Sequence, residues 1–172
     1  MKIFTSSQIA EIDKFTIKHE PISEADLIRR VARKIYEWLK PIIKKGQQIC
    51  IFAGPGNNGS DAIALATYLA ARDYNCKLFL IKGRDVKSDL RRELLNELYV
   101  FGYVEVKEIE SEEDVPVIPA NSLVVEGIFG TGLNRCAEGF FCNVINSINN
   151  SGAKVVSIDL PSGLFSEENP QP

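Results

Sequence analysis

Residues 54–61 constrain the fold of this chain more than any other stretch, because they join an apolar run to a helix-like run through a glycine-rich turn. The stretch reads Gly-Pro-Gly-Asn-Asn-Gly-Ser-Asp and lies between the apolar residues 49–53 and the alanine-rich residues 62–72. A strand, a glycine turn and a helix in this order form a unit in which backbone N–H groups can face a phosphate or another polar ligand. We therefore predict a ligand-binding turn here, although the spacing G-x-G-x-x-G alone is a weak signal.

The carboxylate of Asp61 argues against two familiar kinds of phosphate site. A dinucleotide fingerprint leaves the helix N-terminus free for pyrophosphate, which Asp61 at the predicted helix start would repel. A Walker P-loop needs a lysine that this turn lacks. Taken alone, Asp61 is more typical of an N-terminal cap than of a catalytic group. Asn57 and Asn58 are harder to explain as turn residues, although Asn tolerates left-handed turns.

The composition is typical of one globular domain with a sizeable core: 172 residues, 45% hydrophobic and 25% charged. The net charge of −3 indicates no general affinity for nucleic acid or anionic membranes. No signal peptide is evident at the N-terminus, and no apolar run reaches transmembrane length. We therefore expect a cytoplasmic protein.

Chemistry that needs cysteine or histidine is disfavoured. The four cysteines form no C-x-x-C pair, and the single histidine, His19, lies in a polar stretch. These features argue against a zinc site and against Ser-His-Asp or Cys-His catalysis, unless His19 lies in the site. Acid–base chemistry must therefore fall mainly to carboxylates.

Alternating strands and helices predict an α/β fold. One helix begins behind a Thr5-x-x-Gln8 capping box, and a second, capped by Ser23, ends near Pro41. We predict strands at residues 49–53, 77–81, 104–109, 123–125 and 155–158, helices at residues 62–72, 90–101 and 141–148, a solvated loop at residues 110–114 and a disordered or incomplete tail at residues 166–172. The strands are apolar nearly throughout, which favours a three-layer Rossmann-like, doubly wound, mainly parallel sheet with helices on both faces.

Three polar or glycine-rich stretches directly follow strands of this predicted sheet, at residues 54–61, 126–135 and 159–163. Ligands of such sheets bind beyond the carboxyl ends of the strands, so Glu126 and Asp159 could face one pocket. Considered one at a time, each of these residues has an ordinary interpretation that is as plausible as a functional one. Glu126 could be a solvated carboxylate, Thr131 and Ser162 turn residues, and Arg135 a surface charge. Their joint occurrence favours a functional site.

With these stretches in place, the chain resembles the YjeF N-terminal domain family, the NAD(P)H-hydrate epimerases. The family loop G-x-G-N-N-G-G-D-G corresponds to residues 54–62, its motif D-x-x-F-G-T-G-L-x-R to residues 126–135 and its motif D-x-P-S-G to residues 159–163. Order and spacing agree over essentially the whole chain. The resemblance implies a single domain of this type over residues 1–172, truncated at its C-terminus.

The resemblance implies an isomerase of nicotinamide cofactor repair. The family interconverts the R and S epimers of hydrated NADH and NADPH, so that an S-specific, ADP- or ATP-dependent dehydratase, fused or separate, can restore the cofactor. It further implies a homodimer without nucleic-acid or membrane partners.

By the same resemblance, Asp159 contacts the substrate and is the proton-transfer group. The implied substrate-binding residues are Asn57, Asn58, Gly59, Ser60, Asp61, Gly130, Thr131, Gly132, Leu133, Asn134, Arg135, Cys136 and Asp159. Asn58, Glu126 and Ser162 would hold a potassium ion, and oxygen-rich turns suit such a hard cation. Epimerisation at a carbon that bears OH beside nitrogen needs proton transfer to or from oxygen, which a carboxyl group of raised pKa can perform.

The chain departs from the family pattern in two motifs and in one N-terminal helix. Ser60 and Ala62 replace glycines, Glu126 replaces an aspartate and shifts its oxygens by a methylene, and Arg29 and Ala32 replace the Glu and Gly of L-M-E-x-A-G. The departures motivate an alternative, a catalytically weakened nucleotide-ligand-binding or scaffold module of the same fold. A dinucleotide-dependent reductase fits less well, because Arg84 precedes Asp85 at the end of the second strand and no Tyr-x-x-x-Lys pair is evident.

Overall fold

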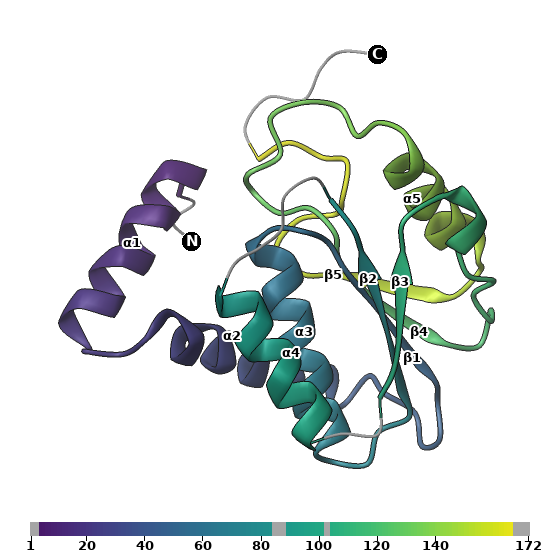
Figure 1. Ribbon diagram of the computed structural model, residues 1–172, viewed down its shortest axis with the longest axis horizontal. Helices are drawn as coiled ribbons and strands as arrows, with labels where there is room; N and C mark the ends of the chain where they lie inside the picture. Colours follow the sequence, from purple (N-terminus) through teal and green to yellow (C-terminus); the bar gives the residue numbers. More distant parts are fainter. Residues whose placement is uncertain (1–3, 84–88, 102–103, 167–172) are drawn as a thin grey trace.

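A computed structural model describes residues 4–83, 89–101 and 104–166 (Figure 1). Five parallel strands form one sheet in the order β3-β2-β1-β4-β5. The strands are β1 (Ile49–Ala53), β2 (Cys76–Ile81), β3 (Glu105–Ile109), β4 (Leu123–Gly127) and β5 (Lys154–Ser157); the helices are α1 (Ser6–His19), α2 (Glu24–Leu39), α3 (Asn57–Ala70), α4 (Asp89–Phe101) and α5 (Phe140–Asn150), with a short 3-10 helix η1 (Glu112–Asp114). The predicted doubly wound α/β fold is confirmed.

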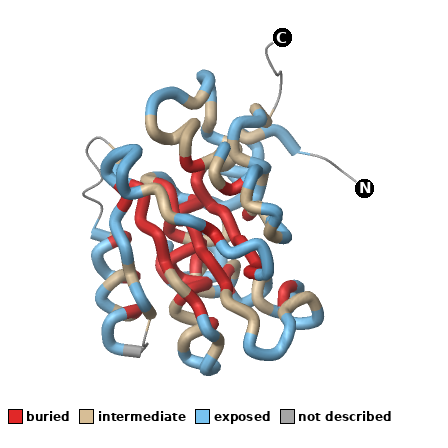
Figure 2. The backbone as a smooth tube through the Cα atoms, turned by 90° about the vertical axis from the view of Figure 1, so that its right-hand side faces the viewer, coloured by how far each residue is buried: buried red, intermediate tan, exposed pale blue. Residues whose placement is uncertain are grey.

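Helices cover both faces of the sheet (Figure 1). α2, α3 and α4 pack on one face, against Ile49, Ile51 and alternating residues of the neighbouring strands, and α5 packs on the other, against Cys50 and Phe52. Every residue of β1 and β4 is buried, because successive side chains point to opposite faces and both faces are covered. Figure 2 shows this buried core running through the middle of the molecule.

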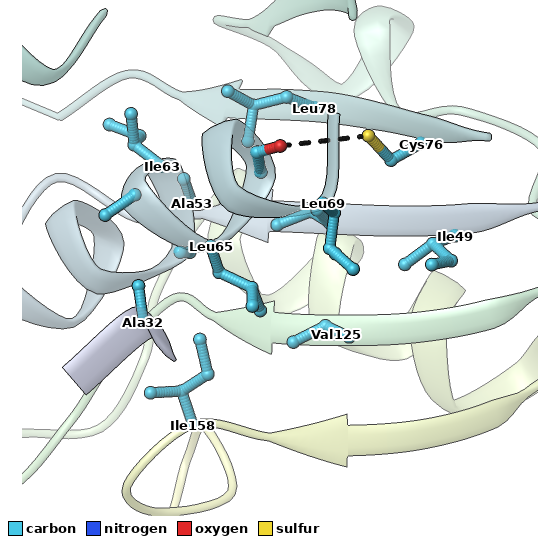
Figure 3. Packing of buried hydrophobic residues seen from close by; sticks show 14 of the residues in the cluster. Ala32, Ile49, Ala53, Ile63, Leu65, Leu69, Cys76, Leu78, Val125 and Ile158 are labelled. Atoms are coloured by element: carbon cyan, nitrogen blue, oxygen red, sulfur yellow. Dashed lines mark hydrogen bonds between the residues drawn. The ribbon is translucent and has the colours of Figure 1, made fainter. Parts of the chain in front are cut away.

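α3 lies at the centre of the larger core (Figure 3). Its Ile63, Leu65 and Leu69 are fully buried. Near the C-terminal end of the helix, the thiol of Cys76 donates to the carbonyl oxygen of Ala66 across 4.0 Å. Each of these aliphatic side chains stabilises the fold by about 1.5–3 kcal/mol through burial, so α3 is held rigidly where it leaves the glycine turn.

The two N-terminal helices begin as predicted but pack differently. Thr5 and Ser23 both form capping boxes. α2 buries Ala25, Ile28, Ala32 and Leu39. By contrast α1 buries none of its residues, and its apolar side chains Ile12 and Phe15 are 44% and 61% exposed. Local capping signals therefore identified both helices without indicating which one joins the core.

Most element boundaries lie within two residues of the predicted ones, and α3 is the exception. It begins at Asn57 and not at residue 62. The predicted loop at residues 110–114 contains the exposed helix η1. Arg84, Asp85 and residues 167–172 of the predicted tail lie outside the described residues. Within the described ranges, no helix combines the length and apolar character needed to cross a membrane.

Candidate active site

The candidate site lies at the carboxyl ends of β1, β4 and β5. β1 and β4 are neighbours, yet β1 leads into α3 on one face while β4 leads towards α5 on the other. Such a switch point leaves a crevice beyond the strand ends, where ligands of doubly wound sheets bind. The three stretches singled out in the sequence leave these three strands, so the fold brings them to the same edge.

We call the start of α3 open because no side chain caps it. Its N-cap is Gly56, which has no side chain with which to cap the helix. The first backbone N–H groups of a helix have no intrahelical partner and favour anions. Asp61 is the fifth residue of the helix, so its interpretation as an N-cap is wrong. The tertiary contacts of the glycine turn override the poor helix propensity of Asn-Asn-Gly-Ser.

Glycine is required at two positions of this turn. A Cβ on Gly54 would lie 1.9 Å from the carbonyl oxygen of Ile128, and one on Gly59 would lie 1.8 Å from the carbonyl oxygen of Gly54. Both contacts are far too short: a side chain at position 54 would force the β1 and β4 turns apart, and one at position 59 would push the start of α3 away from the turn after β1. The turn is therefore pressed directly against the residues that follow β4.

Asn58 ties the three turns together. Its Nδ2 donates to the carbonyl oxygens of Phe129, 2.7 Å away, and Ile158, 3.0 Å away. The residue is only 8% exposed, and its Oδ1 is buried without a hydrogen-bond partner in the part of the chain that the structure describes. An unpaired buried amide oxygen costs about 1–3 kcal/mol, which makes it a candidate ligand for a cation.

Glu126 is buried and not solvated, so its interpretation as a solvent-exposed strand-end carboxylate is wrong. It is 3% exposed. Its oxygens accept hydrogen bonds from the Ser162 hydroxyl (2.5 Å), the Ser162 N–H (3.0 Å) and the Ile128 N–H (3.2 Å). Among the described residues it forms no ion pair. The glutamate thus links the β4 and β5 turns and leaves a buried negative charge without a countercharge.

Asp159 is held in a strained position at the solvent-exposed side of the site. Its φ of 65° is in the left-handed region, which costs non-glycine residues of order 1 kcal/mol. The N–H of Thr131 donates to its Oδ2 across 2.9 Å. A Cβ on Gly130 would lie 2.8 Å from the same oxygen. The Thr131 N–H therefore orients this carboxylate, which occupies space that a side chain at position 130 would fill.

Asp61 lies one helical turn after Asn58 and is partly buried. Burial, and repulsion from Asp159 and Asp13, raise the pKa of Asp61 to about 7. Asp13 belongs to α1, so the N-terminal helix contributes a charge to the environment of the site. Sequence reasoning missed Asp13, because nothing in a capped amphipathic pattern indicates where that helix docks.

Arg91 of α4 is a second residue that sequence reasoning missed. Its guanidinium donates to the carbonyl oxygen of Gly54 across 2.8 Å, and the side chain is buried. Burial lowers the pKa of Arg91. A signal existed, because Arg91 shares the helical spacing of the buried residues Leu94 and Leu98. A charged residue on an otherwise apolar helix face indicates a specific buried partner, and here that partner is the glycine turn.

The remaining implied site residues lie on an irregular loop after β4. Gly132, Asn134, Arg135 and Cys136 are exposed. The N–H of Leu133 donates to the carbonyl oxygen of Gly130 (3.1 Å) and closes a turn. Apart from that turn, the described contacts connect the loop to the site only through Gly130 and Thr131. Beyond these two residues the loop is largely exposed, and we call residues 130–136 the rim loop.

The departures from the family pattern have structural explanations in α2 and α3. Arg29 pairs with Glu93 at 2.7 Å and with Glu97, and so joins α2 to α4. Ala32 and Ala62 are buried in the core. Ser60 is buried in the first turn of α3. The charge reversal at position 29 is thus compensated by glutamates of α4.

These features define the class: a doubly wound α/β protein with a polar ligand site at its topological switch point. The chain belongs to the YjeF-related protein N-terminus family, which matches residues 24–171. α1 precedes the matched range.

Relatives and one solved structure extend this assignment. A relative from Dictyoglomus turgidum, named bifunctional NAD(P)H-hydrate repair enzyme Nnr, is 33% identical over 97% of this chain and 32% of its own length. One from Limosilactobacillus reuteri, named NAD(P)H-hydrate epimerase, is 29% identical over 95% of this chain and 74% of its own. The chain thus spans about a third of such bifunctional relatives. The crystal structure of yeast ynu0 (YNL200c) matches the whole chain and 75% of its own with a TM-score of 0.78 at 23% identity, a likeness of fold.

Proposed function

We propose that this protein is an NAD(P)H-hydrate epimerase, which interconverts the R and S epimers of hydrated NADH and NADPH. The observation that carries the proposal is the position of Asn58, whose amide joins the glycine turn after β1 to the turns after β4 and β5. The names of the relatives in the same family support the reaction. The polar groups of these turns offer phosphate, ring and cation contacts in one place.

We assign substrate binding to the open start of α3 and to the rim loop. The uncapped N–H groups of Asn57, Asn58 and Gly59 suit the pyrophosphate of a dinucleotide. Residues 130–136 follow β4 and carry exposed polar side chains that can contact the rest of the substrate. Asp61 does not oppose this assignment, because it lies one turn inside the helix.

Asp159 is the proposed proton-transfer residue. The reacting carbon bears a hydroxyl group beside a nitrogen, and its inversion requires a proton to leave or reach oxygen as a bond breaks and re-forms. Asp159 is exposed and can exchange protons with solvent, and the Thr131 N–H fixes its orientation. A positioned carboxylate of this kind contributes about 10²–10⁴-fold to a rate.

The residues of the site fit a potassium ion held by Asn58, Glu126 and Ser162. The unpartnered Oδ1 of Asn58 and the buried, unpaired carboxylate of Glu126 both favour a cation. When bound, the ion would neutralise the buried charge and stiffen the three turns. These residues already connect the turns, since Ser162 hydrogen-bonds to Glu126 and accepts from the Phe129 N–H at 2.9 Å.

The potassium proposal has a test that does not depend on activity. The melting temperature of the wild type should rise with KCl but not with choline chloride of equal ionic strength, because binding to the folded state stabilises it. Glu126→Gln, which removes the charge, should abolish the difference. Glu126→Asp, which restores the family residue, should strengthen it. Equal KCl responses in all three proteins would contradict this ligand set.

Several properties rest on family membership and remain proposals. A fused or separate ADP- or ATP-dependent dehydratase as partner follows from the bifunctional relatives. A homodimer, a cytoplasmic location and a single domain over residues 1–172 stay predictions. Light scattering on the purified chain would measure the oligomeric state.

The reaction is tested by recovery of the reduced cofactor. Purified R-hydrate is mixed with an excess of S-specific dehydratase, and NADH formation is followed with and without this chain. We expect acceleration by the wild type and its loss in Asp159→Asn, which keeps the side-chain size and tolerates a left-handed φ. Hydrate binding without acceleration would favour the alternative, a ligand-binding module of the same fold.

A further inference from the structure

Asp61 and Asp159 come from different elements and face the same site. Asp61 is on α3, Asp159 follows β5, and the two are close enough for the charge of Asp159 to influence the ionisation of Asp61. Asp159 is exposed, whereas Asp61 is partly buried. Two carboxyl groups in such different environments can hold different protonation states at one pH.

The geometry of α3 directs Asp61 towards the reacting region. Asn58 and Asp61 are three residues apart and therefore lie on the same face of the helix. Asn58 on that face contacts the carbonyl oxygen of Ile158, the residue before Asp159. The next residue, Ala62, is also turned to this edge, with its Cβ 3.1 Å from the Cβ position of Gly127. Asp61 is thus one turn along a helix face that packs on the β4 and β5 turns.

Epimerisation at the hydroxyl-bearing carbon needs two proton-transfer groups by either route. If the ring opens, a carboxylate takes the hydroxyl proton as the carbonyl forms, and an acid protonates the nitrogen, which keeps the electron pair of the broken C–N bond. Closure on the other face reverses both transfers. If the hydroxyl leaves, an acid protonates it, water departs with the C–O pair, and a carboxylate deprotonates the water that adds to the opposite face. Both routes start from one protonated and one ionised group.

We propose that Asp61 is the second proton-transfer residue of this site and acts as a pair with Asp159, an assignment that rests on the proposed epimerase function. In the ring-opening route Asp61 supplies a proton and Asp159 accepts one in the first half, and the roles exchange in the second half. In the hydroxyl-loss route Asp61 protonates the leaving hydroxyl and Asp159 then takes the proton of the water that adds. No other described residue of the three turns combines a carboxyl group with this partial burial. Glu126 is already engaged by three donors.

The electrostatic surroundings support this division of roles. Burial, Asp159 and Asp13 raise the pKa of Asp61 to about 7, so the group holds its proton near neutral pH. Among the described residues, the charged groups that raise its pKa are two carboxylates, Asp13 from α1 and Asp159 after β5. Arg91 of α4 is directed to the carbonyl oxygen of Gly54.

The test compares Asp61→Asn with the wild type and with Asp13→Asn in the coupled assay between pH 5.5 and 9. For Asp61→Asn we expect kcat to fall about 10²–10⁴-fold, with KM changed less than about threefold and the decline of kcat above pH 7 abolished. Asp13→Asn is the matched control, because it removes one neighbouring charge but no proton-transfer group. It should keep kcat at pH 6 and move the alkaline decline to lower pH.

Each outcome decides one of the two proposals. An active wild type together with an Asp61→Asn variant that raises KM at unchanged kcat would show a binding role alone and overturn the pair. An inactive wild type would overturn the epimerase proposal itself. A carboxyl ¹³C titration of the wild type adds a readout without substrate. Asp61 should titrate near pH 7 and shift downward in Asp159→Asn, whereas a midpoint near 4 would contradict the pair.

Discussion

The carboxyl edge of the sheet and the hydrophobic core contain opposite kinds of residues. In the core, side chains such as Ile51 and Leu69 are fully buried, apolar and in regular elements. At the edge, Asn58 has a buried oxygen with no partner among the described residues, Glu126 has a buried carboxylate and Asp159 has a left-handed backbone. Features that cost of order 1–3 kcal/mol each persist only where the surrounding structure stabilises them. The comparison shows that the core supplies the stability that offsets these costs, and that the edge holds polar groups where a ligand can bind.

Leu69→Ala should produce the largest loss of stability while sparing the chemistry. The side chain is fully buried in α3, about three turns from Asn58. We expect the free energy of unfolding to fall by about 2–5 kcal/mol, through lost burial and the cavity that remains. Urea denaturation measures it, and kcat at 20 °C should stay within about twofold of the wild type. A large drop in kcat at unchanged folded fraction would mean that core and edge are not separable.

Asp61→Asn should stabilise the protein at high pH, because the wild type must there keep an ionised, partly buried carboxylate whose pKa is raised. The folded-state pKa of about 7 lies above the reference value of 3.8, so the folded protein retains a proton that the unfolded chain loses. Wild-type stability therefore falls as pH rises from about 4 to 7. The variant should gain roughly 2–4 kcal/mol at pH 8 and little at pH 4. Chemical denaturation at both pH values checks this, and equal gains would contradict the raised pKa.

Gly130→Ala should disturb the edge without weakening the core. The new Cβ would lie 2.8 Å from Asp159 Oδ2 and 3.3 Å from the Cβ of Asn58. Displacing the carboxylate should lower kcat about 10- to 100-fold, since small misplacements of reacting groups have effects of this order. Gly132→Ala is the comparison variant: a Cβ there meets nothing within 4 Å, so an effect on the substrate-binding loop should appear in KM and not in kcat. Similar rates for both variants would show that Asp159 does not need its present position.

Phe15→Ser should have the smallest effect, although Phe15 is a large apolar residue. It is 61% exposed on α1, whereas Ile28 on α2 is buried. We expect a change within about 0.5 kcal/mol for Phe15→Ser against about 2–5 kcal/mol for Ile28→Ala. Thermal unfolding of both variants provides the comparison. A loss at Phe15 as large as that at Ile28 would reveal that something covers α1 in solution.

Local sequence signals predicted most of the fold but not the start of α3. The capping boxes at Thr5 and Ser23, the apolar strands and the alternating order all have local causes, and each is confirmed. The glycine-rich pattern predicts Asn-Asn-Gly-Ser as part of the turn, and the poor helix propensity of these residues agrees with that prediction. They are helical because Gly54 and Gly59 have no side chains, so that other backbone segments can pack where a Cβ would otherwise lie. That approach is a tertiary contact which no propensity encodes.

Parts of the candidate site could be predicted because a parallel sheet places all its carboxyl strand ends on one edge. Residues that directly follow β1, β4 and β5 must then be neighbours, and Asn58, Phe129 and Ile158 are in contact. Burial was harder to predict. For Glu126 the sequence left a solvated carboxylate and a pocket residue as equal alternatives, and the structure shows Ser162 and Ile128 donating hydrogen bonds to a buried carboxylate. Their hydrogen bonds depend on how two loops fold back, which spacing does not specify.

The sequence by itself determined the alternation of strands and helices, the helix caps and the three polar turns, since each depends on interactions between residues close in the chain. Only the tertiary structure decided that Asp13 and Asp159 act on the ionisation of Asp61 and that α1 stays outside the core. Ionisation depends on distance and burial in space, and the groups that set it for Asp61 come from elements far apart in the sequence.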